Sequence, residues 1–596
     1  MTSCSNNQAV FATSAQTGST TYTVAVSTSV KDANGNPMAS GYPFSYTTQA
    51  VSNNAPVLSW ASAGCLTEGV RPRTGPSGGY YEFRVVYADA EGACPSYINV
   101  VVNGNTYALG NNDGASCQTG RTYYQTVTIN TVGDLNYYFT ASDGTSQATG
   151  IPTGNHVVSA ITALMVKPGG TSPWYGTIAS AIAASGDPST IMVYPNADFS
   201  AATYSEGGIS FSSKPDRTLQ SVCGRDLTII SGGTSAITFG STNVTVDGFT
   251  ITGGTSYGVY FSSGSAISDI VKNCIIASNS TGVYLNQTCT ATIQDSLIQN
   301  NTTRGINSAS SSALLQVYRC NISSNGSGGS AGAGISISGG SGTHTLQNTT
   351  ISNNNSGTQG GGAIYLINGP SVTIQGCTLN GNTASSGGAI YNNSGSPTLN
   401  IYDTFIQGNS GTSGGGINVN SGAVNMTNVM LTGNKASGNG GAITEQNGGV
   451  INCLFCTVSG NYSGALGGGL YNNTAAASTV RNSIIYNNYD ANANTYEQIY
   501  SQGSNYTYIT TTYTLINQAA GSPGYTDGGG NNVLGNPNFV SPLNPSAAPA
   551  TGGDYHLQSG SPAINAASSS YPYDHDIFGN SRPLGSGYDM GAHEKQ

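Results

Sequence analysis

Acidic side chains are the residues of the central region that could act chemically on a polymer. Hydrolysis of a glycosidic bond needs two carboxylates facing one sugar, and elimination needs a calcium-binding carboxylate cluster with a basic residue. The acids between residues 224 and 520 are few, namely Asp226, Asp247, Asp269, Asp295, Asp403, Glu445, Asp490 and Glu497. His344 is the only histidine of that region, and we interpret a lone histidine as a surface residue. The pattern favours the absence of catalytic residues over an enzyme site.

A second group of ionisable residues lies near the end of the chain, in DHDIFGNSRPLGSGYDMGAHE. It contains Arg582 together with Asp574, Asp576, Asp589, His593 and Glu594. A metal or catalytic site is conceivable there, but a terminal plug with internal ion pairs is the favoured interpretation. The stretch KDANGNP (31–37) loosely resembles a calcium loop, and a β-hairpin turn explains it better. We therefore expect no metal and no cofactor.

The composition excludes several classes of protein. Of the 596 residues only 7% are charged, the net charge is −10, and glycine alone numbers 83; an average globular protein is about 25% charged. The acidic balance argues against nucleic acid as a partner, and no apolar run approaches the 18 or so residues of a membrane helix. The start, MTSCSNNQAV, has no signal peptide, so we expect that a signal was removed or that a longer precursor precedes it.

Internal repeats indicate the architecture. The pattern [Ile/Leu/Val]-x-x-Asn recurs at steps of 22 to 29 residues, ending at Asn279, Asn301, Asn325, Asn354, Asn382, Asn409, Asn434, Asn461 and Asn488. An aliphatic residue precedes each Asn by three positions, an apolar residue lies five residues before that, and a glycine-led strand follows. One repeat cannot bury its apolar face alone, but stacked repeats can. The Asn residues would tolerate left-handed turns and stack their amides into a ladder.

These columns predict an all-β chain with a right-handed parallel β-helix, and the text before them resembles Ig-like sandwiches, which would precede the β-helix. GTIASAIAASGDPSTIMVYP (176–195) predicts a short amphipathic helix that covers the open end of the coil. The expected domains are a partial Ig-like module (1–50), an Ig-like sandwich (51–157), a helical cap with the first coils (158–223), β-helix rungs (224–520) and a C-terminal cap (521–596). Asp295 and Asp403 then share a turn column but lie four rungs apart, about 19 Å.

A row of tyrosines follows the inward residue of the glycine-led strands. Alternation predicts that these side chains point outward and form an interface for sugars or protein; strand propensity alone is the alternative explanation. The row comprises Tyr260, Tyr284, Tyr365, Tyr391, Tyr471 and Tyr500.

Eleven cysteines suggest disulfides, but those of the coil occupy inward positions. Cys274, Cys320, Cys377 and Cys456 share one small-residue column and never occur in adjacent rungs, so they lie at least about 9.6 Å apart and cannot pair. We expect free, buried thiols and no redox or zinc motif at CLFC (453–456). In the second Ig-like module we expect a disulfide between Cys65 and Cys117.

Two segments resemble known families. The rungs are similar to polymorphic outer-membrane protein repeats, and GNPNFVSP…DYHLQSGSPAINAAS…DIFGNSRPLGSGYDMGAHE (535–594) resembles the end of the choice-of-anchor Q β-helix family. TTYTVAVSTSVKDANGNPMASGYPFSYTT (20–48) resembles the second half of a bacterial Ig-like domain of surface-layer proteins. The resemblance implies a secreted bacterial protein whose Ig-like modules are spacers or adhesion units.

The expected function is that of a non-catalytic, extracellular cell-surface or matrix protein with a structural or adhesive role. The expected partners are other copies of the chain, joined head-to-tail through the incomplete first module, or surface glycans. The alternative is a carbohydrate-active β-helix, either a lyase or glycosidase or a glycan-binding protein.

Overall fold

The computed structural model describes residues 3–5, 8–10, 19–32, 34–48, 53–262, 268–340, 342–495, 497–502, 508–521 and 524–595. The described residues are almost entirely β-structure, and they separate into two compact units, residues 1–73 with 80–160 and residues 74–79 with 161–596. We describe each unit by itself.

The first unit is built from antiparallel strands. Two hairpins come first, β1 (Ser3–Ser5) with β2 (Gln8–Val10) and β3 (Thr21–Val26) with β4 (Tyr42–Thr47). A sandwich follows, with one sheet ordered β10-β9-β13-β14 and the other β11-β12-β8-β5, and with β6 beside β8. The bounds are β5 (Val57–Trp60), β6 (Val70–Arg71), β8 (Gly79–Ala88), β9 (Tyr97–Val102), β10 (Asn105–Ala108), β11 (Asn111–Asn112), β12 (Arg121–Ile129), β13 (Gly133–Ser142), the 3-10 turn η1 (Ile151–Thr153) and β14 (His156–Ile161).

The disulfide expected in this sandwich was wrong in one partner. Cys117 is bonded to Cys94, with their Cα atoms 5.3 Å apart, and not to Cys65. Cys94 lies in the loop between β8 and β9, and this loop folds back so that the backbone N–H of Asp89 donates to the carbonyl oxygen of Cys117. Strand order could not predict the pairing because it depends on the path of a loop.

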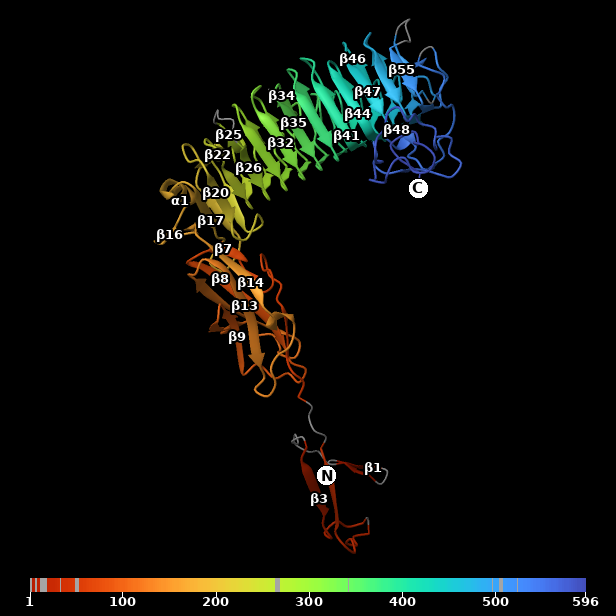
Figure 1. The fold of residues 1–596 in the computed structure, drawn as a ribbon. Coiled ribbons are helices and arrows are strands. Elements are labelled where there is room, and N and C mark those ends of the chain that lie inside the picture. The colour runs from red at the N-terminus through yellow and green to blue at the C-terminus, as the bar shows by residue number, and fades with distance from the viewer. Residues whose placement is uncertain are drawn as a thin grey trace. The chain divides into compact units, whose positions relative to one another are not determined.

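The second unit is a right-handed parallel β-helix in which each rung adds its first two strands to one long sheet and its third strand to another (Figure 1). Before the regular rungs lie β7 (Thr74–Pro76), β15 (Leu164–Val166), β16 (Trp174–Tyr175), α1 (Ile178–Ala184), β17 (Ser189–Val193) and β18 (Ala202–Ser205). Thr177 caps α1, its side chain accepting from the N–H of Ser180, and Ile178, Ala181 and Ile182 face the core. The amphipathic segment therefore covers the first coil, as its pattern predicted.

The 27-stranded sheet holds the first two strands of each rung. The first strands are β20 (Arg217–Ser221), β23 (Thr245–Asp247), β26 (Ser268–Lys272), β29 (Thr290–Gln294), β32 (Leu314–Tyr318), β35 (Thr343–Gln347), β38 (Ser371–Gln375), β41 (Thr398–Gln407), β44 (Ala423–Thr432), β47 (Val450–Leu454), β51 (Ser478–Arg481) and β55 (Ile509–Thr512). The second strands are β21 (Thr228–Ser231), β24 (Thr250–Thr252), β27 (Ile275–Ala277), β30 (Leu297–Gln299), β33 (Asn321–Ser323), β36 (Thr350–Ser352), β39 (Thr378–Asn380), the later halves of β41 and β44, β48 (Thr457–Ser459), β52 (Ile484–Tyr486) and β56 (Leu515–Ile516).

The glycine-led strands form a separate 12-stranded sheet. They are β19 (Ile209–Ser210), β22 (Ser235–Phe239), β25 (Tyr257–Phe261), β28 (Thr281–Leu285), β31 (Arg304–Ser308), β34 (Ile335–Ser338), β37 (Ile364–Ile367), β40 (Ile390–Asn392), β43 (Ile417–Val419), β46 (Ile443–Gln446), β50 (Leu470–Asn473) and β54 (Ile499–Ser501). Four short strands form a further small sheet, β42 (Ser410–Gly411), β45 (Lys435–Ala436), β49 (Tyr462–Ser463) and β53 (Tyr489–Asp490). The chain ends with β57 (Thr526–Asp527), β58 (Phe539–Ser541), the 3-10 turn η2 (Pro545–Ala547) and β59 (Asp554–Leu557).

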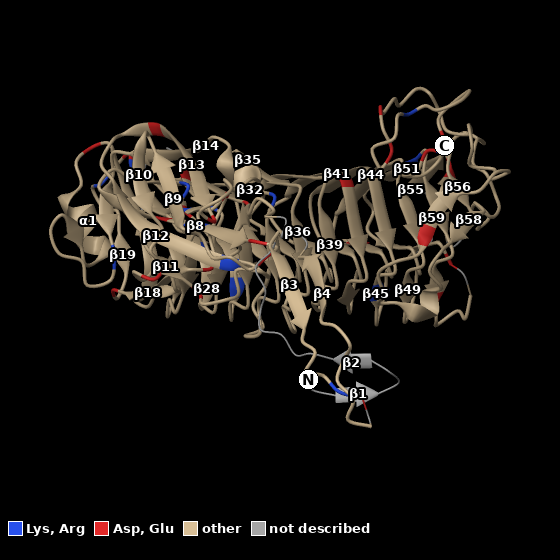
Figure 2. Ribbon diagram, turned by 90° about the horizontal axis from the view of Figure 1, so that it is seen from below, with Lys and Arg blue, Asp and Glu red and all other residues tan. Residues whose placement is uncertain are grey.

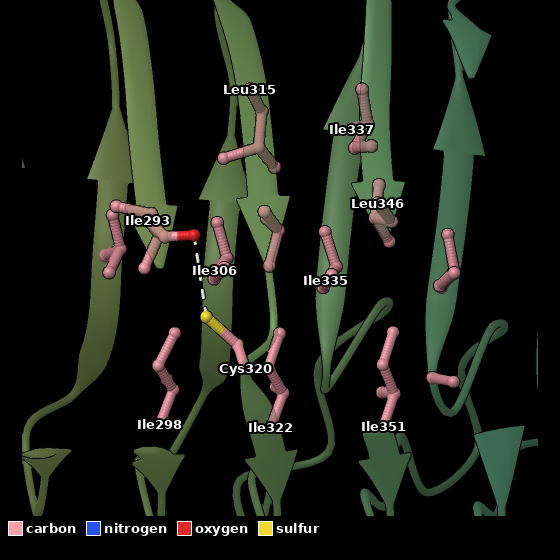
Figure 3. Close-up of a cluster of buried hydrophobic side chains, with 14 of the residues drawn as sticks. Ile293, Ile298, Ile306, Leu315, Cys320, Ile322, Ile335, Ile337, Leu346 and Ile351 are labelled. Carbon is pink, nitrogen blue, oxygen red and sulfur yellow. Dashed lines mark hydrogen bonds between the residues drawn. The ribbon is translucent and has the colours of Figure 1, made fainter. Parts of the chain in front are cut away.

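One continuous apolar core fills the coil. Ile293, Ile298 and Ile306 of one rung face inward and are fully buried, and Figure 3 shows the same positions repeated in the neighbouring rungs. Neighbouring rungs pair in register as parallel strands, and alternate residues of a strand point to the same face. Each inward residue therefore stacks on the equivalent residue of the next rung. The inward aliphatic columns that the sequence predicted are the core of the structure.

Candidate functional site

The recurrent asparagines form a buried ladder along the turn after the second strand. All nine are at most 2% exposed. The Nδ2 of Asn409, for example, donates to the Oδ1 of Asn434 (2.9 Å) and to the carbonyl oxygen of Leu379 (3.0 Å). Equivalent amide contacts of 2.8 to 3.1 Å join the whole series Asn279, Asn301, Asn325, Asn354, Asn382, Asn409, Asn434, Asn461 and Asn488.

The left-handed backbone of this turn belongs to the residue before each ladder Asn. Positive φ values occur at Ser278, Asn353 and Gly408, for example, and not at the Asn residues that follow them. Each ladder Asn therefore contributes its amide hydrogen bonds, and the residue before it contributes the left-handed turn.

Two glutamines that the repeat did not predict continue the ladder. Asn488 donates to the Oε1 of Gln498 (2.9 Å), and the backbone N–H groups of Gln498 and Ile499 donate to the Oε1 of Gln518. Beyond the last asparagine of the ladder, the side-chain amide of Gln518 therefore accepts the backbone N–H groups. The sequence did not predict these residues because the spacing of the repeats becomes irregular after Asn488.

A second inward column lies at the bend between the first and second strands. Cys274, Cys320, Cys377 and Cys456 share this column with hydroxyl residues and Val429, and all four are buried free thiols. The hydroxyls of Ser296, Thr349, Thr404 and Ser483 accept from the backbone N–H of the cysteine in the preceding rung. Burial raises the thiol pKa of Cys274 and of Cys320 to about 12, which disfavours the thiolate, the reactive form of a cysteine. The expectation of free thiols is confirmed.

His344 was expected on the surface, and this expectation was wrong. Its side chain is fully buried in the inward column of β35. The Nδ1 accepts from the N–H of Leu315 (3.1 Å) and the Nε2 lies 3.0 Å from the carbonyl oxygen of Gly339, so the ring is held as a neutral imidazole. Burial accordingly lowers the pKa of His344. The alternation of inward and outward residues along β35 indicates that His344 points inward. The surface prediction was wrong because it relied on the residue type alone.

The tyrosine row is interrupted and only partly exposed. In-register pairs occur at Tyr260 with Tyr284, Tyr365 with Tyr391, and Tyr471 with Tyr500, with ring centroids 5.7 to 5.9 Å apart. Tyr471 is only 5% exposed, which differs from the outward prediction. Gly467 precedes its strand, and a side chain there would collide with the backbone of Leu470 and Tyr471. The glycine-rich turn therefore folds closely over the strand.

The outer face of the first strands carries a different column, which we name the amide–hydroxyl column. In successive rungs it consists of Thr292, Gln316, Thr345, Thr373, Asn400, Asn425, Asn452, Thr479 and Thr510, all partly exposed. Asn425 donates to Asn400 and Asn452 donates to Asn425, both at 2.9 Å. The column repeats uncharged donors and acceptors about every 4.8 Å, and charged residues are sparse over the coil (Figure 2).

Three adjoining hollows follow the bend beside this column, and together we name them the bend groove. The first, of about 540 Å³, is lined by Arg225, Arg319 and Asn348 among others. The second, of about 400 Å³, shares Asn348 and reaches Asp403, Phe405 and His575. The third, of about 410 Å³, shares Phe405 and Phe578 with the second and is closed by residues 552–556. Because consecutive hollows share lining residues, the three adjoin one another in a series from the loop of Arg225 to the C-terminal segment.

The C-terminal segment is held on the coil at Asp403. The Oδ1 of this aspartate accepts from Asn428 (2.8 Å) and from the hydroxyl of Tyr573 (2.9 Å), and it lies 3.0 Å from the Nε2 of His575. Burial alone would lower the pKa of His575, but a hydrogen bond to Asp574 and the negative charge of Asp403 raise it. The sequence singled out Asp403 and Asp574 but gave no sign that His575 joins them.

The remaining ionisable residues of the C-terminal cluster are buried. Arg582 and Glu594 form a fully buried ion pair at 3.0 Å, and the guanidinium lies 4.4 Å from the ring centroid of Phe455. The carboxylates of Asp576 and Asp589 accept backbone N–H groups, and the Nδ1 of His593 accepts from the N–H of Leu557. Asp574 alone in this group is largely exposed, its side chain by 91%. These contacts support the interpretation of the C-terminal segment as a plug with internal ion pairs.

One carboxylate pair was not predicted. Asp490 and Glu497 both accept from the N–H of Gly467, at 3.2 and 3.3 Å. Burial and a hydrogen bond to Asp490 raise the pKa of Glu497 to about 8. Asp490 ends β53 and Glu497 lies in the segment after it, whereas the sequence argument considered carboxylates on neighbouring rungs. A separate acid, Glu445, is fully buried in the core, where burial raises its pKa to about 8.

Within the described ranges, no group of three or more His, Cys, Asp or Glu residues is arranged to hold a metal ion. None of the helices described there is long and apolar enough to cross a membrane.

Comparisons with known proteins agree with the fold. The family model for the right-handed β-helix region matches residues 185–322, and the model for a bacterial Ig-like domain matches residues 1–48. No curated protein matches the chain.

Three similar solved structures are distant from this chain in sequence. Pectate lyase Pel9A is 14% identical with a TM-score of 0.34, covering 73% of this chain and 98% of its own. The pectin methylesterase from Aspergillus niger in deglycosylated form is 16% identical with a TM-score of 0.30, covering 41% and 84%. The Agl-KA catalytic domain is 13% identical with a TM-score of 0.31, covering 79% and 96%. At such values we transfer no activity and no residue role to this chain.

Proposed function

We propose that the protein is a non-catalytic, extracellular bacterial surface or matrix protein whose β-helix adheres to glycans. The observation that carries the proposal is the amide–hydroxyl column. Its uncharged donors and acceptors are held at a fixed repeat by the parallel register of the strands. Sugar hydroxyls are bound by side chains of this kind, and a rigid array reduces the entropy lost on binding.

The hydrogen bonds made by the carboxyls in the bend groove support a binding role. A glycosidase needs a general acid whose pKa is raised. In the groove, hydrogen bonds from the backbone and side chain of His556 lower the pKa of Asp554, and Asp403 is occupied by three donors. Asp576 accepts four hydrogen bonds and is 1% exposed.

The experiment is a screen of the whole chain against neutral and uronic glycans, for binding and for cleavage. We expect binding without new reducing ends or unsaturated products. Introducing charge by Thr345→Lys with Thr373→Lys should weaken binding, whereas Thr203→Lys, on an exposed strand residue of an early coil, should not. Release of reducing ends or unsaturated products by the wild-type chain would refute the non-catalytic role.

A carbohydrate-active enzyme is the second candidate, and the pair Asp490 and Glu497 favours it. A carboxyl whose pKa is raised beside a second carboxyl is a common acid–base arrangement. Asp490 is fully buried, however, and also accepts from the N–H groups of Asn492 and Ala493, which indicates that the pair holds its loop. Loss of a measured cleavage activity in Glu497→Gln, with unchanged folding, would establish this candidate.

We also propose that copies of the chain associate through the first module. In the described residues, β3 and β4 pair with each other, and half of the side chains of β3 are exposed. An exposed strand edge can accept a strand from another copy, and a head-to-tail contact that does not close makes a filament. Deleting residues 1–50 should abolish polymers and leave the coil folded. Polymers that persist after the deletion, or a full-length chain that stays monomeric at high concentration, would contradict this.

A further inference from the structure

The C-terminal end of the bend groove contains an exposed aromatic platform. Phe578 is 45% exposed, and its ring stacks on that of His556, with centroids 4.5 Å apart and planes inclined by 13°. Phe405, on the coil, lies 6.1 Å from Phe578. An exposed phenylalanine held by two neighbouring rings leaves apolar surface in water, which is costly unless a ligand covers it.

The two hollows beside Phe578 have the size and lining of a ligand site. They measure about 400 and 410 Å³, within the range of roughly 300–1,000 Å³ for small-molecule pockets. Gln375, Asp403 and His575 line one of them, and Gln407, Asp554 and His556 line the other. Polar groups thus surround an aromatic surface on both sides, an arrangement suited to a pyranose ring with its apolar face and its rim of hydroxyls.

We propose that these hollows bind consecutive units of a neutral, linear polysaccharide, with Phe578 as the stacking surface between them. The inference rests on the proposed glycan-binding function and names its site and ligand class. The groove continues past Asn348 toward Arg225, so that an extended chain has room beyond these two units.

The charges at this end of the groove select a neutral ligand. Asp403 lines one hollow and Asp554 the other, and Asp574 contacts His575 of the first hollow; the three side chains are 15%, 44% and 91% exposed. A uronic acid would bring its own negative charge close to these three groups, and like charges repel. Carboxylates accept hydrogen bonds from sugar hydroxyls, so a neutral hexose or pentose chain suffers no such cost.

The test is calorimetric titration of the full chain with cellohexaose, xylohexaose and mannohexaose as neutral probes and with hexagalacturonate as the acidic one. We expect binding of a neutral probe. Phe578→Ala should weaken it by about tenfold, the effect of losing one stacked ring. Phe578→Tyr, which keeps the ring, should bind nearly as wild type. Leu584→Ala, at a 41% exposed cap residue outside the hollows, should leave affinity unchanged.

The outcomes separate this site from the proposed function. Equal affinity in Phe578→Ala and wild type would overturn the site while leaving glycan binding intact. Tighter binding of hexagalacturonate would overturn the neutral ligand class. Absence of binding to every probe would overturn both proposals. If Phe578→Ala lowers the melting temperature, Phe578→Trp provides a second measurement. The fluorescence of the introduced indole should change when a neutral probe stacks on it. Constant fluorescence on addition of a neutral probe would show that the site is wrong.

Discussion

The Nε2 of His575 lies 3.0 Å from the Oδ1 of Asp403, although 172 residues separate them in the chain. Asp403 is in the bend of a central rung, and His575 belongs to the segment that follows β59. The contact fixes the C-terminal segment against the coil and forms one wall of the bend groove. Because the imidazole also contacts Asp574 on its other nitrogen, its protonated form has an acceptor at each N–H.

This contact should make attachment of the C-terminal segment dependent on pH. The pKa of His575 in the folded chain is raised above its ordinary value of about 6.5. Its contribution to stability is therefore complete below about pH 6.5 and is lost as pH rises through the folded pKa. Hydrogen exchange of residues 571–582, corrected for intrinsic rates, should become less protected at alkaline pH.

The control for this effect is His575→Gln, which cannot gain a proton. Its exchange protection should be lower at acidic pH and should vary less with pH than that of the wild type. An unchanged pH profile in His575→Gln would show that another group is responsible.

Removing one amide from the buried ladder should be far more damaging than removing one from the exposed column. Asn409→Ala leaves Asn382 and Asn434 without their partner inside the coil, and we expect a loss of about 1–3 kcal/mol in the free energy of unfolding. Asn425→Ala breaks similar contacts to Asn400 and Asn452 at a partly exposed position, where water replaces them. Denaturant unfolding of both variants measures the difference, and equal small losses would contradict a stabilising ladder.

Glu445 should destabilise the coil as pH rises. Burial raises its folded pKa to about 8, and its Oε1 has no hydrogen-bond partner. The unfolded chain loses this proton above about pH 4.5, so the stability falls between that pH and about 8. Glu445→Gln should therefore be near neutral at pH 4.5 and stabilising at pH 7.5 by up to about 4 kcal/mol. A gain that is independent of pH in denaturant unfolding would show that Glu445 is already ionised.

The disulfide between Cys94 and Cys117 should stabilise the sandwich and not the coil. Their separation of 23 residues corresponds to about 3 kcal/mol of lost chain entropy in the unfolded state. Cys94→Ala with Cys117→Ala should lower the sandwich transition by that amount and leave the coil transition in place. Mass spectrometry after alkylation supplies the control, because the six buried thiols of the coil should react only after unfolding.

The pair of Tyr365 and Tyr391 tests whether the tyrosine row is an interface. Their rings lie 5.7 Å apart, and the hydroxyl of Tyr365 accepts from the Nδ2 of Asn393 at 2.7 Å. If the row contacts sugars or another copy, Tyr365→Ala with Tyr391→Ala should weaken glycan binding or self-association. Unchanged binding and association would leave strand propensity as the explanation of the row.

The sequence alone determined the features that repeat from rung to rung. The inward aliphatic residues, the ladder from Asn279 to Asn488 and the cysteine column could all be predicted, because parallel stacking places equivalent residues in identical surroundings. The periodic sequence pattern therefore predicts which residues stack on one another in the coil. The amphipathic segment over α1 could be predicted for a related reason, since a helix period differs from that of the strands around it.

Only the tertiary structure decided the features that depend on how irregular segments return to the coil. The partner of Cys117 is set by the loop that carries Cys94, and the end of the ladder is set by Gln498 and Gln518 in segments without regular spacing. The contact of Asp403 with His575, and with it the platform at Phe578, joins parts of the chain that share no period. Such contacts are fixed by the three-dimensional path of loops of variable length, and no spacing along the sequence records that path.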